Sequence, residues 1–219
     1  MAAKFKPELQ LLQGPQRRLW GELRDVPGSF VLCGGTAVAL HLGHRQSVDF
    51  DFLGSAEFDP DALYHEIPFL KGTQPLQKSA STLTCLVDRG GPVRVSFFGA
   101  PTVRLIESSL VAPDNGLRVA SLLDLAGMKA AVVQKRAEAK DYLDLDAMLL
   151  SGKVSLPDAL AAGRAIYGTV FNPELTLKSL CYFGDGNLST LPRELQDRLA
   201  AAVRAVDLDH LPDVRRRPR

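Results

Sequence analysis

A buried strand followed directly by two glycines constrains this chain more than any other stretch. Residues 30–33 are all apolar, which is typical of a strand that is covered on both faces. The pair Gly34-Gly35 then allows a sharp turn and a close backbone approach to a ligand, because neither residue has a Cβ. We expect a short helix over residues 37–42, with Thr36 as its N-cap and Gly43 after its end.

The second predicted strand carries two carboxylates that alternate with phenylalanines. Because successive side chains of a strand alternate faces, Asp49 and Asp51 point to one side, and the phenylalanine after each of them enters the core. Such a pair also occurs by coincidence or on solvent-facing edge strands. The chemical interpretation is a site for a hard divalent cation, usually Mg²⁺, held by a few carboxylates and by substrate phosphates. The glycine turn and the hydroxyls of Thr36 and Ser47 then hold those phosphates.

These motifs, in this order, resemble the nucleotidyltransferase toxin family of the AbiEii/AbiGii type, within the DNA polymerase β-like nucleotidyltransferase superfamily. The matching residues are Gly34, Gly35, Thr36, Arg45, Ser47, Asp49 and Asp51, with a second block of Lys129, Arg136, Lys140, Asp141 and Asp144. The resemblance covers most of the chain. It implies an α/β (α+β) fold with a polymerase β-like core, in which a small mixed sheet carries the acids. A mainly helical C-terminal half supplies Lys129 and closes the cleft.

The resemblance also implies a reaction. A nucleoside monophosphate passes from an NTP to an acceptor hydroxyl, and pyrophosphate is released. Asp49 and Asp51 would hold Mg²⁺ or Mn²⁺, while Gly34, Gly35, Thr36 and Ser47 would bind the nucleotide's phosphates. The implied acceptor is tRNA, at its 3′ end, or another RNA, and the implied role is that of a toxin with a cognate antitoxin.

Lys129 would place a compact positive charge on the phosphates. Arg45 would pair with one of the aspartates, contact phosphate or support the structure. Asp141 or Asp144 would orient Lys129 or bind the base.

The second block lies in a stretch with no helix breaker. Residues 121–149 contain no proline and one interior glycine, Gly127, so we predict a helical segment that begins at Ser121, with Asp124 placed for a capping box. At about 100° per residue, an unbroken helix brings four charged residues to one face. They are Lys129, Arg136, Lys140 and Asp144. A charged face of this kind is commonly only solvated, and a break near Ala137 would spread these residues and turn Asp141 inward.

One departure from the superfamily pattern concerns the third acid. Polymerase β-like transferases usually carry a third carboxylate on a neighbouring central strand. In the strand predicted over residues 93–98, Ser96 stands at the expected position. A neutral hydroxyl is a poor Mg²⁺ ligand and a poor general base. Either a carboxylate from the helical block takes its place, or the activity is reduced or lost. The alternative function is therefore a catalytically weakened or inactive nucleotide-binding module that keeps the fold, and a third class is γ-phosphate transfer to a protein.

The remaining pattern predicts the organisation of the chain. We expect a nucleotidyltransferase core over residues 1–120, a helical subdomain over 121–210 and a disordered basic tail over 211–219. In the core, the pattern predicts a hairpin of strands 82–87 and 93–98, a helix capped by Asp59 and short edge strands at 105–106 and 117–119. Helices are expected to begin near residues 156, 173 and 193.

The composition bears on which partners the protein binds and in which compartment it works. A formal net charge of +1 gives no global attraction to nucleic acid or membrane, so RNA must be bound by local patches. The three cysteines are Cys33, Cys85 and Cys181, whose spacing suggests neither zinc nor a disulfide framework. Reduced thiols in a cytosol fit this spacing best, and no run approaches the ~20 apolar residues of a membrane span, so we expect a cytoplasmic protein.

Overall fold

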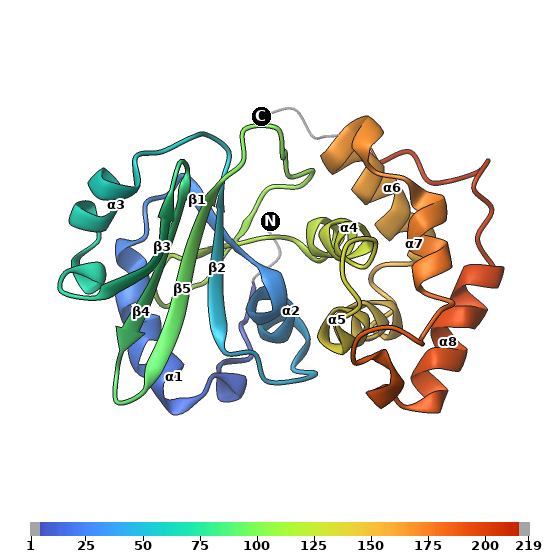
Figure 1. The fold of residues 1–219 in the computed structure, drawn as a ribbon, viewed down its shortest axis with the longest axis horizontal. Helices are drawn as coiled ribbons and strands as arrows, with labels where there is room; N and C mark the ends of the chain where they lie inside the picture. The colour runs from blue at the N-terminus through green and yellow to red at the C-terminus, as the bar shows by residue number, and fades with distance from the viewer. Residues whose placement is uncertain (1–4, 215–219) are drawn as a thin grey trace. The chain divides into compact units, whose positions relative to one another are not determined.

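The structure, a computed structural model, describes residues 5–214, which divide into two compact units. The described part of the first unit is residues 5–104 and 109–120, and that of the second is residues 105–108 and 121–214. Figure 1 draws strands and helices α1–α3 in the first unit and helices α4–α8 in the second. Buried apolar side chains occur in both, so each unit has its own core.

The first unit is built on a seven-stranded mixed sheet with the order β3-β4-β5-β2-β1-β7-β6. The strands are β1 (Phe30–Cys33), β2 (Asp49–Gly54), β3 (Gln74–Ser79), β4 (Thr82–Asp88), β5 (Pro92–Gly99), β6 (Leu110–Val111) and β7 (Arg118–Val119). Strand β2 pairs antiparallel with β1 and parallel with β5, and β1 also pairs parallel with β7. The predicted mixed sheet is therefore confirmed, with β2 at its centre.

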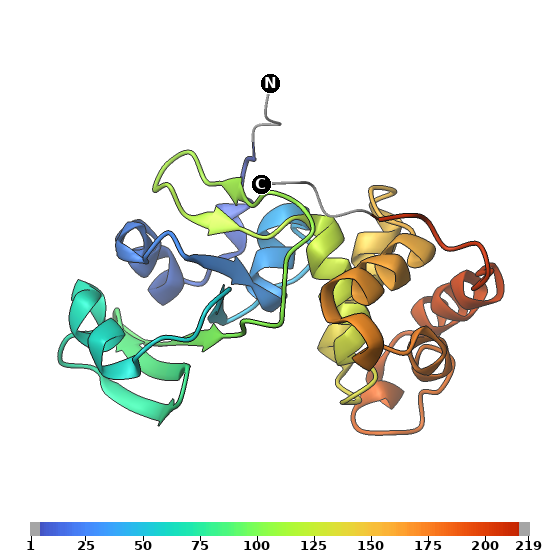
Figure 2. The same cartoon turned by 90° about the horizontal axis from the view of Figure 1, so that it is seen from above.

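Helices cover the two faces of this sheet unequally. They are α1 (Gly14–Trp20), α2 (Gly34–Leu42) and α3 (Pro60–Glu66), with short 3₁₀ turns at Leu9–Leu11, Gly21–Asp25 and Pro68–Leu70. Figures 1 and 2 show α1 and α3 on one side of the sheet and α2 on the other. The ring of Trp20 lies 6.4 Å from that of Phe50, and Phe52 stacks on Phe97 at 5.1 Å. These aromatic contacts place the main core on the face opposite the carboxylates of β2.

Several predicted elements of the first unit are confirmed. Strands β4 and β5 form the expected hairpin. The Asp59 side chain caps α3, where it accepts the backbone N–H of Asp61 at 2.9 Å. Gly43 ends α2 in the left-handed conformation, at φ 66°, and its N–H donates to the carbonyl of Ala39. Helix ends marked by residues with a steric or hydrogen-bonding reason are thus predictable from sequence.

Two edge strands were not anticipated correctly. The prediction of a strand at residues 105–106 is wrong, because β6 begins at Leu110 and pairs with β7. Strand β3 is not predicted at all, since its six residues are all exposed and show no alternation. The backbone pairing of β3 with β4, rather than burial of its side chains, stabilises this strand.

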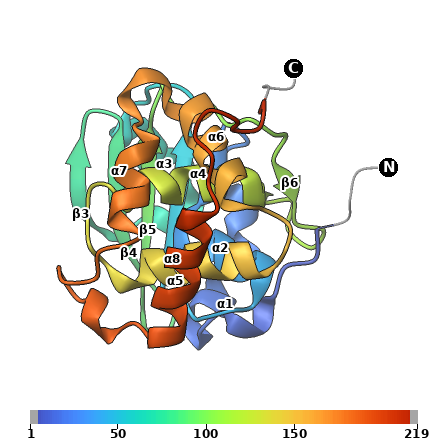
Figure 3. The same cartoon turned by 90° about the vertical axis from the view of Figure 1, so that its right-hand side faces the viewer.

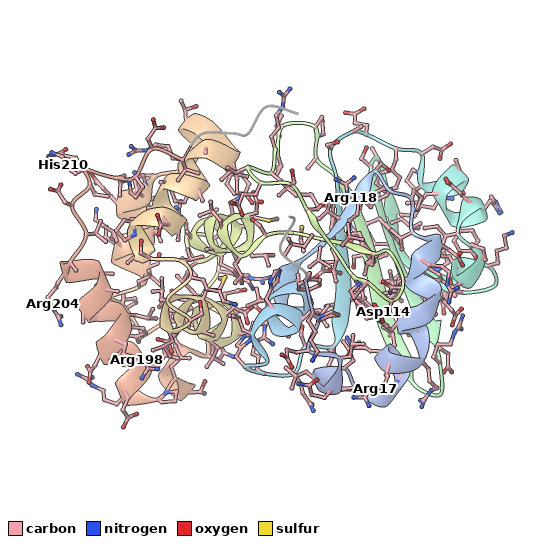
Figure 4. The ribbon with its side chains drawn as sticks, turned by 180° about the vertical axis from the view of Figure 1, so that it is seen from behind. Arg17, Asp114, Arg118, Arg198, Arg204 and His210 are labelled. Carbon is pink, nitrogen blue, oxygen red and sulfur yellow. The ribbon has the colours of Figure 1, made fainter. Side chains whose placement is uncertain are left out.

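The second unit is a bundle of five α-helices. They are α4 (Leu122–Val132), α5 (Ala139–Leu150), α6 (Leu156–Tyr167), α7 (Pro173–Ser179) and α8 (Arg193–Arg204), with 3₁₀ turns at Gly168–Val170 and Leu188–Thr190. Helix α4 packs against α5, α6 and α7, and α8 packs against α5, as Figure 3 lets the reader follow. Arg198, labelled in Figure 4, binds Asp146 of α5 through two hydrogen bonds of 3.0 and 2.6 Å.

The predicted continuous helix over residues 121–149 is wrong, because α4 ends at Val132 and α5 begins at Ala139. The start is as predicted, since the Ser121 hydroxyl accepts the N–H of Asp124 at 3.0 Å. The carboxylate of Asp124 accepts the Ser121 hydroxyl at 2.7 Å and the N–H of Ile106 at 2.6 Å. Burial raises the pKa of Asp124 above its ordinary value, although these hydrogen bonds oppose the shift.

Two further expectations concern the ends of the chain and the membrane. Residues 211–214 have no regular secondary structure, and the rest of the predicted basic tail lies outside the described residues. Within residues 5–214, no helix has the length and apolar character needed to span a bilayer.

We predict that Gly127→Ala lowers the free energy of unfolding by about 1–3 kcal/mol, because a Cβ at this position would lie 2.8 Å from the backbone of Ala162 and force α4 away from α6. Urea unfolding followed by far-ultraviolet circular dichroism measures the change. The control is Gly21→Ala, since its Cβ would meet only the tip of Arg24 at 3.7 Å and its φ is −65°. Equal unfolding free energies for Gly127→Ala and the wild type would refute the packing argument.

Candidate active site

The two aspartates of β2 lie on one face of the sheet, as the alternation predicts. Phe50 and Phe52, on the opposite face, are fully buried. Asp51 is in register with Cys33 of β1 on one side and with Ser96 of β5 on the other. The carboxylates are therefore held at the centre of the sheet, on its most regular strands.

Gly34 brings the backbone of the β1–α2 turn directly against Asp51. Its φ of +73° lies in the left-handed region, and a Cβ added to it would lie 2.8 Å from Oδ2 of Asp51. Only glycine meets both requirements without displacing the carboxylate. The backbone thus approaches Asp51 closely here, and the predicted approach to a ligand stays a prediction.

Thr36 does not cap α2, contrary to the prediction. The helix begins at Gly34, and its N-cap residue is Cys33, which makes no side-chain cap hydrogen bond. The Thr36 hydroxyl instead donates to the backbone carbonyl of Asp49 and fixes the first turn of α2 to β2. The first N–H groups of any helix lack intrahelical partners and favour an anion, so α2 begins as an anion-attracting group beside Asp51.

The arginine that pairs with Asp49 is Arg94, which the sequence alone did not reveal. Arg94 stands beside Asp49 in the parallel register of β2 and β5, and its Nη2 binds Oδ2 of Asp49. The side chain of Arg94 is 50% exposed and that of Asp49 is 22% exposed. Arg45 donates to the backbone carbonyl of Gln46 at 2.9 Å, and its pairing with Asp49 or Asp51, or its contact with phosphate, stays a prediction. Ser47 precedes β2 and is partly exposed.

Ser96 lies on β5 at the position where the superfamily pattern has a third carboxylate. It is 3% exposed, in register with Asp51 and, on its other side, with Thr84. Across residues 5–214, no group of three or more His, Cys, Asp or Glu side chains is placed to hold a metal ion. Asp49 and Asp51 supply carboxylate oxygens of the kind that Mg²⁺ or Mn²⁺ prefers, and that they hold such a cation stays a prediction.

The second block of predicted residues forms an ion-pair group within the second unit. We call it the Lys129 cluster: Lys129, Arg136, Asp141 and Asp144. The Nζ of Lys129 lies 2.6 Å from Oδ1 of Asp141 and 2.6 Å from Oδ2 of Asp144. The Nε of Arg136 lies 2.7 Å from Oδ2 of Asp141. Lys140 is not part of it and pairs with Glu138 at 2.8 Å, so the predicted common helix face is wrong.

Burial explains why these charges bind one another. Asp141 and Asp144 are fully buried, and Lys129 is 8% exposed at its side chain. Burial alone would raise the pKa of Asp141, but the hydrogen bonds and charges of Arg136 and Lys129 outweigh it and lower that pKa below its ordinary value. Asp141 therefore turns inward, as the alternative with a helix break near Ala137 anticipates. Whether Lys129 also acts on phosphates stays a prediction.

We predict that Lys129→Met lowers the free energy of unfolding at pH 7 by about 3–5 kcal/mol, because it leaves two buried carboxylates without their shared cation. The control is Lys140→Met, whose half-exposed pair with Glu138 is worth at most about 1 kcal/mol. Urea unfolding at several pH values measures both changes.

The pH dependence has opposite signs in the two proteins. In the wild type the pKa of Asp141 is lowered, so its contribution to stability is present above the ordinary value of 3.8 and is lost as the pH falls through the lower folded value. In Lys129→Met, Asp141 keeps only Arg136 and Asp144 loses the Lys129 cation, so burial favours protonation of these acids and the unfolding free energy rises as the pH falls from 7 toward 5. Parallel pH profiles for the two proteins would contradict this account.

Comparison with known proteins gives the family. Residues 19–216 match the family model described as nucleotidyl transferase AbiEii toxin, type IV TA system. A curated relative from Aquifex aeolicus, described only as an uncharacterized protein, is 32% identical over 158 residues, which are 71% of this chain and 74% of that protein.

Two solved structures share the fold. The chain is similar to MenT4, a nucleotidyltransferase toxin from Mycobacterium tuberculosis H37Rv, with a TM-score of 0.59 and 19% identity over 88% of this chain and 82% of that one. It is also similar to a putative nucleotidyltransferase from H. pylori, with a TM-score of 0.50 and 17% identity over 86% and 91% of the two chains. The α/β core with acids on a central strand and a helical second unit is therefore that of a nucleotidyltransferase, and the chain belongs to the AbiEii toxin family of type IV toxin–antitoxin systems.

Proposed function

We propose that the first unit binds an NTP as its Mg²⁺ or Mn²⁺ complex and transfers the nucleoside monophosphate to a hydroxyl of an RNA, most simply the 3′ end of a tRNA. The observation that carries this proposal is the approach of the Gly34 backbone to the carboxylate of Asp51. It places anion-attracting N–H groups and metal-binding oxygens side by side, which is what a metal–triphosphate complex requires.

Each candidate site residue of the first unit has a defined role in this proposal. Asp49 and Asp51 bind the cation, and the first turn of α2, held to β2 by Thr36, donates N–H groups to the β- and γ-phosphates. Ser47 adds a hydroxyl donor to the same phosphates. When bound, the cation neutralises the triphosphate and makes the attacking oxygen more acidic. The protein's own contribution is positioning, which accounts for a large part of the barrier in transfers of this kind.

Lys129 keeps its proposed role on the phosphates, but its ion pairs change how that role is tested. Because Lys129 binds two buried carboxylates at 2.6 Å, its removal affects folding as well as any catalytic step. Loss of activity in a Lys129 variant is therefore weak support. Asp49 and Asp51 lie on the sheet face that is not part of the main core, so their substitution is the cleaner test.

A second candidate function is a nucleotide-binding module without transfer activity. Ser96, in register with Asp51, favours it, since the superfamily usually places a carboxylate there. A single pair of acids supports one cation, whereas phosphoryl-transfer sites often use two. NTP binding without pyrophosphate release distinguishes this candidate from the first, and label from the γ-phosphate on a protein product identifies a kinase-like reaction.

The biological setting follows from the family. We propose that the protein acts on RNA in the cytoplasm and stops growth, and that a cognate antitoxin opposes it. Type IV membership supports the antitoxin, without requiring that the two proteins touch.

We predict that Asp49→Asn and Asp51→Asn each abolish transfer of α-phosphate label from NTPs to total tRNA in the presence of Mg²⁺, with at least about a hundredfold loss of rate. The reason is that the neutral amide removes a charged ligand of the cation. The assay includes each of the four NTPs separately, so that it also identifies the nucleotide.

The matched control is Asp61→Asn, which removes an exposed carboxylate of α3 that binds Lys78. We expect Asp61→Asn to transfer label to tRNA at the wild-type rate. If the wild-type protein binds NTP but labels neither RNA nor protein, the result supports the non-catalytic module instead. Full transfer by well-folded Asp49→Asn and Asp51→Asn would refute the assigned site.

A further inference from the structure

The central aspartates have different neighbours on their two sides. Toward β1, the neighbour is the turn at Gly34, with the first N–H groups of α2. Toward β5, the neighbours are Arg94, beside Asp49, and Ser96, beside Asp51. The side toward β1 therefore attracts phosphate through the backbone, while the side toward β5 presents side chains.

Reaction geometry assigns these two sides to different substrates, on the basis of the proposed function. In transfer at a phosphorus atom, the attacking and leaving oxygens lie roughly in line on opposite sides. If the triphosphate lies toward α2, the pyrophosphate leaves on the side toward β1. The acceptor hydroxyl must then approach from the side toward β5.

The surface on that side has the chemistry of a single-stranded nucleic acid site. Register places three rows of side chains on the carboxylate face of β5 and β4: Arg94 with Leu86, Ser96 with Thr84, and Phe98 with Thr82. Phe98 is 38% exposed and Leu86 is 40% exposed, whereas Ser96 and Thr84 between them are only 3% and 6% exposed, so the two outer rows are the accessible ones. The opposite face of the same strands buries Val95, Phe97, Leu83 and Cys85 completely. Any of the four bases can stack on an exposed aromatic ring. An arginine nearby can bind the phosphate backbone of the nucleic acid.

Arg94 is the cation of this surface, and its present partner is the carboxylate that the metal needs. The Arg94–Asp49 pair is half exposed on the arginine side, so it is a weak pair that a divalent cation can displace. Once Asp49 binds the cation, the guanidinium loses its attraction to that carboxylate. A planar guanidinium is well suited to a phosphate.

We propose that Arg94 exchanges Asp49 for a phosphate of a single-stranded RNA acceptor that lies across β5 and β4, with Phe98 stacked on one of its bases. In the absence of substrate, Arg94 neutralises Asp49. With metal and nucleotide bound, it holds the acceptor so that its terminal hydroxyl faces the α-phosphate.

The test is a binding measurement that needs no turnover. A fluorescein-labelled RNA of about ten nucleotides with a free 3′-hydroxyl is titrated with protein, Mg²⁺ and a non-hydrolysable NTP analogue, and anisotropy gives the affinity. We expect Arg94→Gln to weaken RNA binding about tenfold. We also expect the slope of log K against log salt concentration to become shallower by about 0.7, the value for one lost phosphate contact on a single strand. Arg94→Lys should keep the slope.

Phe98→Ala separates stacking from charge, and Arg118→Gln is the matched control. Phe98→Ala should weaken RNA binding by about tenfold without changing the salt slope. Arg118, labelled in Figure 4, is an exposed arginine of β7, on the other side of β1 from the aspartates. Its removal should change neither affinity nor slope. Circular dichroism confirms that each variant is folded.

A second measurement tests the exchange itself. Without nucleotide and RNA, Arg94→Gln should bind Mn²⁺ about threefold more tightly than the wild type, because the competing cation is gone. Asp49→Asn should lose this binding. Unchanged or weaker Mn²⁺ binding in Arg94→Gln would overturn the exchange.

The outcomes separate this inference from the proposed function. No RNA binding by the wild type, an unchanged salt slope in Arg94→Gln, or an equal loss in Arg118→Gln each overturns the acceptor surface. Label transfer to a protein, with no Arg94-dependent RNA binding, also overturns it. RNA binding that depends on Arg94 and Phe98, in a protein that transfers no nucleotide, refutes the reaction and supports the surface.

Discussion

The approach of one backbone segment to one carboxylate organises the first unit. Gly34 lies so close to Asp51 that a Cβ would fall 2.8 Å from its oxygen. The hydroxyl of Thr36 then ties the first turn of α2 to the backbone of Asp49. The same contacts that define the fold thus bring helix N–H groups to the acids. Fold and candidate site share one constraint, because neither the turn nor the anion site tolerates a side chain at residue 34.

The second unit depends on a different constraint, the desolvation of charge. Asp141 and Asp144 are fully buried and would be unfavourable there without cations. Lys129 supplies one from α4, and Arg136 supplies another to Asp141 from the segment between α4 and α5. Both cations reach Asp141 because the chain turns back before α5. An unbroken helix would direct these side chains along one face instead of toward one another. No proline or glycine lies between Val132 and Ala139, and the break there brings these charges together.

This difference explains what the sequence reveals and what it does not. The alternation of Asp49 and Asp51 with phenylalanines, the glycine turn and the position of Ser96 follow from local rules, and the structure bears out their placement. Arg94 was missed because its partnership depends on the parallel register of β2 and β5, which are far apart in sequence. The break after Val132 has no proline or glycine to mark it, and β3 shows no burial pattern. Long-range pairing of strands and charges decides these features, and local patterns in a single sequence do not reveal which segments pair.

Ser96 shows how charge limits the central strands. Two carboxylates one step apart on β2 already repel each other, and Arg94 and the start of α2 offset that repulsion from either side. A third carboxylate at residue 96 would stand in register with Asp51 at a position that is 3% exposed, where an unpaired charge is costly. A serine avoids this cost, and its buried hydroxyl lies beside Thr84 in the next strand. In the proposed function, the remaining oxygen ligands of the cation would then come from the triphosphate and water. Metal and nucleotide are therefore expected to depend on each other for binding more strongly here than in a site with three acids.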